Sequence, residues 1–166
     1  MIAATVAFYF IAGLVKPPKQ PTFSIEEMCR VIDLRNASEI KVRQEFYRDM
    51  TRWTRLYGVD VPFVNQKGYS GARQDLELIL GRAAVVYVED EKSDPITRNG
   101  TWVRYMWTQG KLIQFELVRD GWATVNDEGR HGRYGKFLIA AEDEARKFRD
   151  GMWAEKAQSL GLTQVE

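Results

Sequence analysis

The sequence predicts an α+β protein that combines several short strands with amphipathic helices. Strands are indicated by segments in which apolar and polar residues alternate and by a run rich in β-branched residues. Helices are indicated where apolar residues recur every three or four positions. The chain has 166 residues, which is enough for one domain with a core of its own and a short appendage.

Composition and charge narrow the possible classes of function. The formal net charge is +1, so the chain lacks the basic excess with which a dedicated nucleic-acid binder neutralises phosphates. Its single cysteine, Cys29, has no partner for an internal disulfide. With one histidine and one cysteine in the whole chain, a zinc site built from these residue types is excluded.

A continuous apolar run, Ile2 to Val15, opens the chain. As a helix it would be about 21 Å long, which is shorter than the hydrocarbon core of a bilayer at about 30 Å. A secretory signal would carry a basic start and a small-residue cleavage site, and the run shows neither clearly. We expect residues 1–15 to form a membrane-anchor helix, and the alternative is a helix packed inside a partner protein.

A proline-rich segment, residues 16–21, follows the apolar run. Its three prolines favour a stiff, extended spacer that holds the domain away from the anchor. We expect the folded domain to occupy residues 22–157 and a polar tail to occupy 158–166.

The first half of the domain is predicted to begin with a short helical turn. Ser24 is a candidate cap for it, and two glutamates favour a helix N-terminus there. Two strands follow at Met28–Asp33 and Glu39–Val42. Residues 44–50 then interrupt the strand pattern with a charged insertion to which no role is assigned.

The rest of the domain begins with one central strand over Arg52–Asp60, which Pro62 would end because proline has no N–H for the ladder. The further predicted elements are a helix at Tyr69–Gly81 capped by Gly81, strands at Ala83–Val88 and Trp102–Trp107, a short helix ended by Gly121, a last strand at Trp122–Val125, and a helix within Tyr134–Trp153. Leu138, Ala141, Ala145 and Phe148 form the apolar stripe of that final helix.

Three of these segments resemble a known family. The stretch RWTRLYGVDVPF at 52–63 resembles the R-L-x-G-V-D-x-P-E signature of the staphylococcal-nuclease family. Residues 111–125 resemble its V-N-x-x-L-V-x-x-G-x-A-x-V motif, and 141–153 resemble its C-terminal helix with the G-x-W ending. The resemblance covers roughly residues 28–155. It implies a five-stranded OB-type β-barrel with three helices, preceded in this chain by the short hydrophobic helix.

The resemblance also implies where catalytic residues would stand. In that family the arginine steadies the transition state, the aspartate holds a calcium ion, and the glutamate after the proline activates or orients the attacking water. Arg55 and Asp60 match the first two, but Phe63 stands at the position of the glutamate.

Two further positions depart from the family pattern. The family's D-G-D-T turn aligns with Asp33-Leu34-Arg35-Asn36, so Arg35 stands where a calcium ligand is expected and would repel the ion. Thr101 stands where a second phosphate-binding arginine is expected, and Arg98 and Arg104 lie nearby but out of register. We therefore expect no catalytic site, no metal and no cofactor.

Several residues have simpler interpretations than a catalytic one. We expect Arg55 and Asp60 to form an internal ion pair or a contact that stabilises the turn, and Asp33 to be a turn residue. His131 is expected in a solvated polar loop, and Cys29 in the core. The basic residues between Arg30 and Arg55 alternate with acidic ones, which favours a solvated surface over a nucleic-acid groove.

The resulting hypothesis is a catalytically degenerate, membrane-anchored domain that serves as an accessory or structural subunit of a membrane protein complex. Its expected partners are protein subunits and, through Ile2 to Val15, the lipid bilayer; nucleic acid is not expected. By analogy with membrane-anchored relatives, the mitochondrial inner membrane and a respiratory-chain or ATP-synthase assembly are favoured. The alternatives are a membrane-anchored metal-dependent nuclease and a non-catalytic nucleic-acid-binding module.

Overall fold

The computed structural model describes residues 15–47, 50–81, 85–91, 96–97 and 99–154. Its elements are η1 (Ile25–Glu27), β1 (Met28–Leu34), β2 (Glu39–Gln44), β3 (Thr51–Leu56), β4 (Val59–Asp60), α1 (Tyr69–Leu80), β5 (Val85–Glu89), β6 (Trp102–Thr108), β7 (Lys111–Leu112), α2 (Ile113–Arg119), β8 (Thr124–Val125), α3 (Asp127–His131) and α4 (Gly135–Phe148). The α+β class is confirmed.

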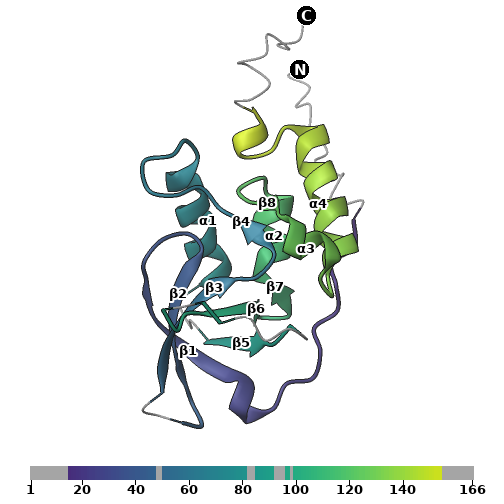
Figure 1. The fold of residues 1–166 in the computed structure, drawn as a ribbon. Coiled ribbons are helices and arrows are strands. Elements are labelled where there is room, and N and C mark those ends of the chain that lie inside the picture. The colour runs from purple at the N-terminus through teal and green to yellow at the C-terminus, as the bar shows by residue number, and fades with distance from the viewer. Residues whose placement is uncertain (1–14, 48–49, 82–84, 92–95, 98, 155–166) are drawn as a thin grey trace, which may run out of the picture.

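Five strands close into a mixed β-barrel. The sheet order is β3-β2-β1-β5-β6-β7, with β7 a short extension, and β3 also pairs with β6 in parallel, so that the sheet meets itself. The helices lie at one end and on one side of this barrel (Figure 1). Closure removes the open edges that a sheet would otherwise expose. The arrangement is the five-stranded barrel with helices that the resemblance implies.

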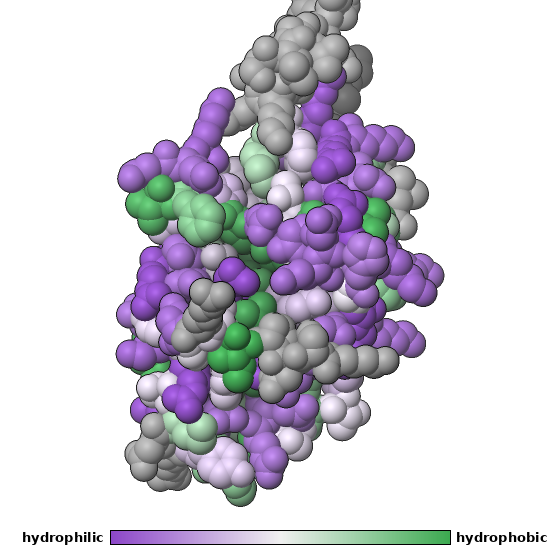
Figure 2. Space-filling view, in the orientation of Figure 1, coloured by the Kyte–Doolittle hydropathy of each residue, from purple (hydrophilic) through white to green (hydrophobic). Residues whose placement is uncertain are grey.

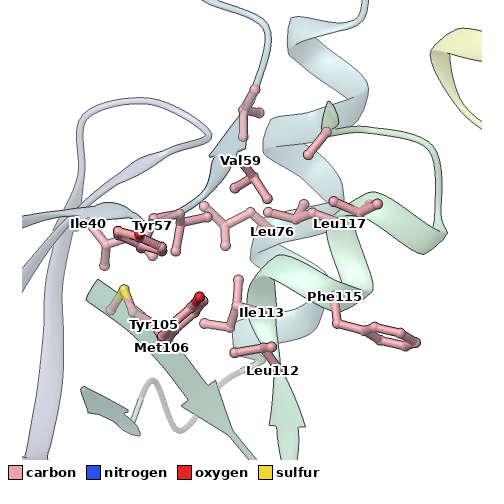
Figure 3. Packing of buried hydrophobic residues seen from close by; sticks show 14 of the residues in the cluster. Ile40, Tyr57, Val59, Leu76, Tyr105, Met106, Leu112, Ile113, Phe115 and Leu117 are labelled. Carbon is pink, nitrogen blue, oxygen red and sulfur yellow. The ribbon is translucent and has the colours of Figure 1, made fainter. Parts of the chain in front are cut away.

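The core lies between the barrel and the helices α1, α2 and α4. Figure 3 shows Leu76 of α1 and Leu117 of α2 pointing toward Val59 and Tyr57. β6 is buried on both faces, since every residue from Val103 to Thr108 is buried. Gln114, at the position where family members carry asparagine, is fully buried and joins α2 to β6. It accepts the N–H of Met106 and donates to the carbonyl of Arg104.

Several predicted elements differ in extent from those observed. The segment expected as one strand over Arg52–Asp60 is two strands, because the chain turns at Tyr57 and Gly58, where Gly58 adopts a φ of 76°. The strand expected at Trp122–Val125 is only β8. A short helix, α3, adds to the three that were expected, and His131 ends this helix instead of lying in a loop.

The final helix is also shorter than its segment. α4 ends at Phe148, because Arg149 adopts the left-handed conformation. Leu138, Ala141 and Ala145 are buried as predicted, but Phe148 is 41% exposed. The prediction that Phe148 belongs to the core stripe is therefore wrong, since the last turn of α4 extends past the core.

The proline-rich segment packs against the domain instead of extending away from it. The Val15 N–H donates to Glu144 of α4 at 3.0 Å, Pro18 is buried, and Phe23 stacks on Tyr87 with ring centroids 5.1 Å apart. In Figure 1 this segment runs down the right side of the view, from α4 to η1. We call residues Val15–Phe23 the strap. The prediction was a stiff, extended spacer between the anchor and the domain, whereas the strap packs on the domain.

The predicted anchor, residues 1–15, lies outside the described residues except for Val15, and the whole of the predicted tail, 158–166, lies outside them too. Within the described part of the chain, none of the helices is both long enough and apolar enough to cross a membrane.

Candidate functional site

Four of the five positions that the resemblance aligns with catalytic residues, 55, 60, 63 and 101, line one hollow at the end of β3, whereas Arg35 does not line it. Its lining residues are Ser38, Glu39, Arg55, Leu56, Gly58, Val59, Asp60, Val61, Phe63, Asn126 and Glu128. A neighbouring depression shares two of these, Glu39 and Arg55, and adds Thr97, Asn99 and Thr101. We call the two together the β3 hollow. The closed barrel assembles it, because β3 pairs with β2 on one side and with β6 on the other.

Arg55 and Asp60 both lie in the β3 hollow but do not pair with each other. Arg55 is exposed on β3, directly opposite Glu39 of β2, and makes no ion pair with another described residue. Asp60 is exposed and accepts a hydrogen bond from the Asn126 side chain at 3.2 Å. The expected ion pair is therefore wrong. The alternative, a contact that stabilises the turn, describes Asp60.

Asn126 fixes Asp60 from the other side of the hollow. Its backbone N–H donates to the carbonyl of Gly58, and its side-chain oxygen accepts the N–H of Gly129 as the cap of α3. The same side chain thus caps the N-terminus of α3 and holds the aspartate. The pattern of asparagine followed by Asp127 and Glu128 is the sequence signal for such a cap, but its contact with Asp60 depends on the pairing of β4 with β8.

The Arg35 side chain contacts a carboxylate and an aromatic ring. Its Nη1 lies 3.0 Å from Oε2 of Glu39, and its guanidinium carbon lies 4.1 Å from the centroid of the Trp53 ring. Asp33, beside it, is exposed and accepts the N–H of its neighbour Leu34 at 2.8 Å. Asp33 lies within β1, opposite Lys41 and beside an irregularity of the register, so the interpretation of Asp33 as a turn residue is wrong.

Phe63 and Thr101 supply no catalytic group. Phe63 is 64% exposed at the rim of the β3 hollow, and a phenyl ring cannot accept a proton from water. Thr101 is buried at 5% exposure and its N–H donates to the Thr97 hydroxyl, so it stabilises a turn. Arg104 does not replace the missing arginine, because it is buried and pairs with Asp90. Arg98 lies outside the described residues.

Glu39 is a site residue that the sequence analysis did not single out. It lines both parts of the β3 hollow and pairs with Arg35. Its alternation with Ile40 on β2 could have placed it on the outer face, but only the strand register puts it opposite Arg55. Glu128, at the start of α3, adds a third carboxylate to Glu39 and Asp60 around the hollow.

These carboxylates do not converge as metal ligands. Among the described residues there is no group of three or more His, Cys, Asp or Glu side chains placed to hold an ion. A hard cation such as calcium needs six to eight oxygen ligands, several of them from protein. The described residues of the hollow therefore offer ionic and hydrogen-bonding contacts, with an apolar rim at Phe63.

Two other candidate residues have structural roles. Cys29 is fully buried, and burial, together with Glu45, raises the pKa of its thiol to about 12, so the unreactive thiol form prevails. The prediction that Cys29 is a core residue is confirmed. His131 is exposed and its Nδ1 lies 2.9 Å from the Asp127 carbonyl.

The basic residues between Arg30 and Arg55 lie on a mixed surface. Arg30 pairs with Glu45 at 2.7 Å, and Arg35 pairs with Glu39. Lys41 lies over the Trp53 ring at 5.7 Å. Because acidic partners neutralise part of this charge, the surface is the solvated one that was expected.

A comparison with protein-family models identifies the family of this chain. The model of the staphylococcal nuclease homologue family matches residues 54–155, which is more than half of the chain. The chain belongs to this family. The match begins within β3 and runs to the end of the described residues. No curated protein matches the chain.

Proposed function

We propose that this chain is a non-catalytic member of its family that acts as a membrane-anchored accessory subunit of a membrane protein complex. The proposed loss of catalysis rests mainly on the presence of an arginine at position 35. It stands where the resemblance expects a metal-binding carboxylate, and it is held there by Glu39 and Trp53.

The chemistry of phosphodiester hydrolysis supports this proposal. A metal-assisted reaction needs carboxylates that converge on the ion, a group that activates water, and cations for the oxygens of the transition state. In the β3 hollow, Arg55 is a cation in the expected place and Asp60 a carboxylate, but Phe63 and Thr101 replace the other two groups. A scaffold kept without its chemistry suits binding to other proteins.

The surface around the β3 hollow supports a role in protein binding. Phe63 and Val64 are both exposed on the loop between β4 and α1, where Figure 2 shows hydrophobic side chains at the surface, on the upper left. Exposed apolar side chains beside charged ones are typical of protein interfaces. By analogy we place the complex in the mitochondrial inner membrane, with Ile2 to Val15 as the anchor and a respiratory-chain or ATP-synthase assembly as the setting.

The experiment that tests this function is gentle detergent extraction of the native membrane, followed by a native gel and mass spectrometry of the band that holds the chain. Stoichiometric migration with one large complex is expected. Migration as a free monomer would contradict the role of an accessory subunit.

A cleavage assay tests the loss of catalysis separately. The purified chain is incubated with DNA and with RNA in calcium, and no cleavage above background is expected. Asp60→Asn is the matched control. Calcium-dependent cleavage that disappears in Asp60→Asn would show an active nuclease and overturn the proposal.

A further inference from the structure

The strap determines which end of the domain lies next to the predicted anchor. The apolar run of the sequence ends at Val15, and Val15 is bound to α4 through Glu144. Consecutive Cα atoms are about 3.8 Å apart. The apolar run therefore reaches to within one residue of α4, with no spacer between them.

The three contacts of the strap make this attachment firm. Val15 packs against the hydrophobic core in addition to its hydrogen bond, Pro18 is buried, and Phe23 stacks on Tyr87. Residues 16–21 lie on the domain side of Val15, so they cannot lengthen the distance between domain and anchor. An anchor attached in this way constrains how the domain can turn above the membrane.

The end of α4 carries the residue types that suit a lipid headgroup layer. Phe148 and Arg149 are exposed, the Lys147 Nζ lies 5.5 Å from the Phe148 ring, and the Arg146 guanidinium lies 4.6 Å from the Trp153 ring. Aromatic rings and long basic side chains are enriched at membrane interfaces, where an apolar body meets a polar layer.

The charge on this end is mixed, which favours one class of lipid. Besides the three basic residues, Asp143 and Asp150 are exposed there, and Arg146 is already paired with Glu142 at 3.0 Å. A nearly balanced surface complements headgroups that carry both a phosphate and an ammonium. It offers little net attraction to a strongly anionic membrane.

We propose that the end of α4, defined by Arg146, Lys147, Phe148, Arg149 and Trp153, contacts the zwitterionic headgroup layer of the membrane that holds the anchor. This inference rests on the anchoring in the proposed function. It orients the domain, because the β2–β3 end of the barrel lies at the opposite end of the view from α4 in Figure 1 and then faces away from the membrane.

The test uses the full chain bound to phosphatidylcholine vesicles. Lys147→Cys and Arg43→Cys each place one labelled thiol at an exposed basic position, on α4 and on β2 respectively. The native Cys29 is fully buried and stays unlabelled. A fluorophore on each thiol is quenched by lipids that carry a nitroxide in the headgroup, and flotation of the vesicles reports anchoring in the same samples.

We expect the label at position 147 to be quenched several-fold more than the label at position 43. Equal quenching in protein that floats with the vesicles would overturn the proposed orientation and leave the anchor intact. Failure of the chain to float would overturn the anchoring, and the orientation with it.

Glu144 provides a second variant with a conservative control. Glu144→Ala removes the acceptor of the Val15 N–H, whereas Glu144→Gln keeps a side-chain carbonyl in its place. The difference in quenching between positions 147 and 43 should shrink in Glu144→Ala and persist in Glu144→Gln. An unchanged difference in Glu144→Ala would refute the positioning role of this contact.

Discussion

The guanidinium of Arg35 lies over the ring of Trp53, with its carbon 4.1 Å from the ring centroid. Arg35 follows the end of β1, whereas Trp53 belongs to β3, and the β2 strand between them contributes Glu39, which binds the same guanidinium. At an exposed position such as this one, a ring and a carboxylate each contribute only weakly to holding the cation. The resemblance expects a metal-binding carboxylate at position 35, where this chain carries a positive charge, and this difference is the basis for the first prediction.

Placing carboxylates at positions 35 and 63, where the resemblance expects acidic residues, should confer calcium binding. In the double variant Arg35→Asp with Phe63→Glu, one carboxylate stands at the metal-ligand position that the resemblance implies, and the other stands at position 63, which lines the hollow together with Asp60. Calcium at millimolar concentration should then raise the melting temperature of the variant, because a ligand that binds only the folded state stabilises it. The wild-type chain should show no such shift.

The matched control is Arg43→Asp with Val64→Glu, which makes the same changes of charge at exposed positions outside the motif stretches 33–36 and 52–63. It should respond to calcium as the wild type does. A calcium-dependent shift of equal size in this control would mean that added negative charge alone explains the effect.

Gly58→Ala should destabilise the fold strongly. A Cβ at this position would lie 2.6 Å from the Cα of Gly129, and Gly58 has a φ of 76°. The steric overlap and the backbone strain together should lower the free energy of unfolding by about 2–4 kcal/mol. Urea unfolding followed by tryptophan fluorescence measures the loss.

Gly100→Ala separates these two causes. Gly100 has a φ of 78°, but no described atom lies within 4 Å of the added Cβ. Only the strain remains, so we expect a loss of about 1 kcal/mol. Equal losses in the two variants would refute the steric role of the contact between Gly58 and Gly129.

Asp75 should make the fold less stable as the pH rises. Burial, followed by the charge of Asp120, raises its pKa from 3.8 to about 6, although Arg119 opposes the shift. Its Oδ2 is buried without a hydrogen-bond partner among the described residues. The folded state therefore holds this proton more tightly than the unfolded chain, and the stabilisation is lost between about pH 4 and pH 6.

Asp75→Asn, which resembles the protonated aspartic acid, should therefore stabilise the protein at pH 7 by about 1–2 kcal/mol. The gain should disappear below pH 4, where Asp75 is protonated in both states. Urea unfolding at several pH values provides the measurement, and Asp143→Asn, at an exposed position of α4, is the control. A gain that does not change with pH would refute titration of Asp75 as its cause.

Glu89 should contribute more to stability than any surface carboxylate. It is only 7% exposed, accepts hydrogen bonds from Trp107 and Tyr134 at 2.8 Å each, and pairs with Arg133. Glu89→Ala leaves a buried N–H and a buried hydroxyl without an acceptor, so we expect a loss of about 3–5 kcal/mol in urea unfolding.

Glu89→Gln distinguishes the contribution of the hydrogen-bond acceptor from that of the negative charge. The amide oxygen can still accept from Trp107 or Tyr134, so the loss should fall to about 1–2 kcal/mol. A glutamine variant as unstable as the alanine variant would show that the charge, and not the acceptor, carries the stabilisation.

Local patterns in the sequence were sufficient for much of the fold. Apolar spacing placed α1 and its cap at Gly81 within one residue, and alternation placed β1 and β2. The turn at Gly58 was missed because the alternation from Arg52 to Asp60 continues through it. The short helix α3 was missed because its residues are mostly polar, so no apolar stripe marks it.

The sequence by itself determined the family and the order of most elements, because both depend on residue type and spacing. It also showed which of the motif positions 35, 55, 60, 63 and 101 keep the residue type of the family. Only the tertiary structure decided which of these side chains meet. Arg55 lies opposite Glu39 through strand register, and Asp60 is held by Asn126 through the pairing of β4 with β8. The strap was likewise a tertiary outcome, since proline content sets the stiffness of a segment but not the surface on which it packs.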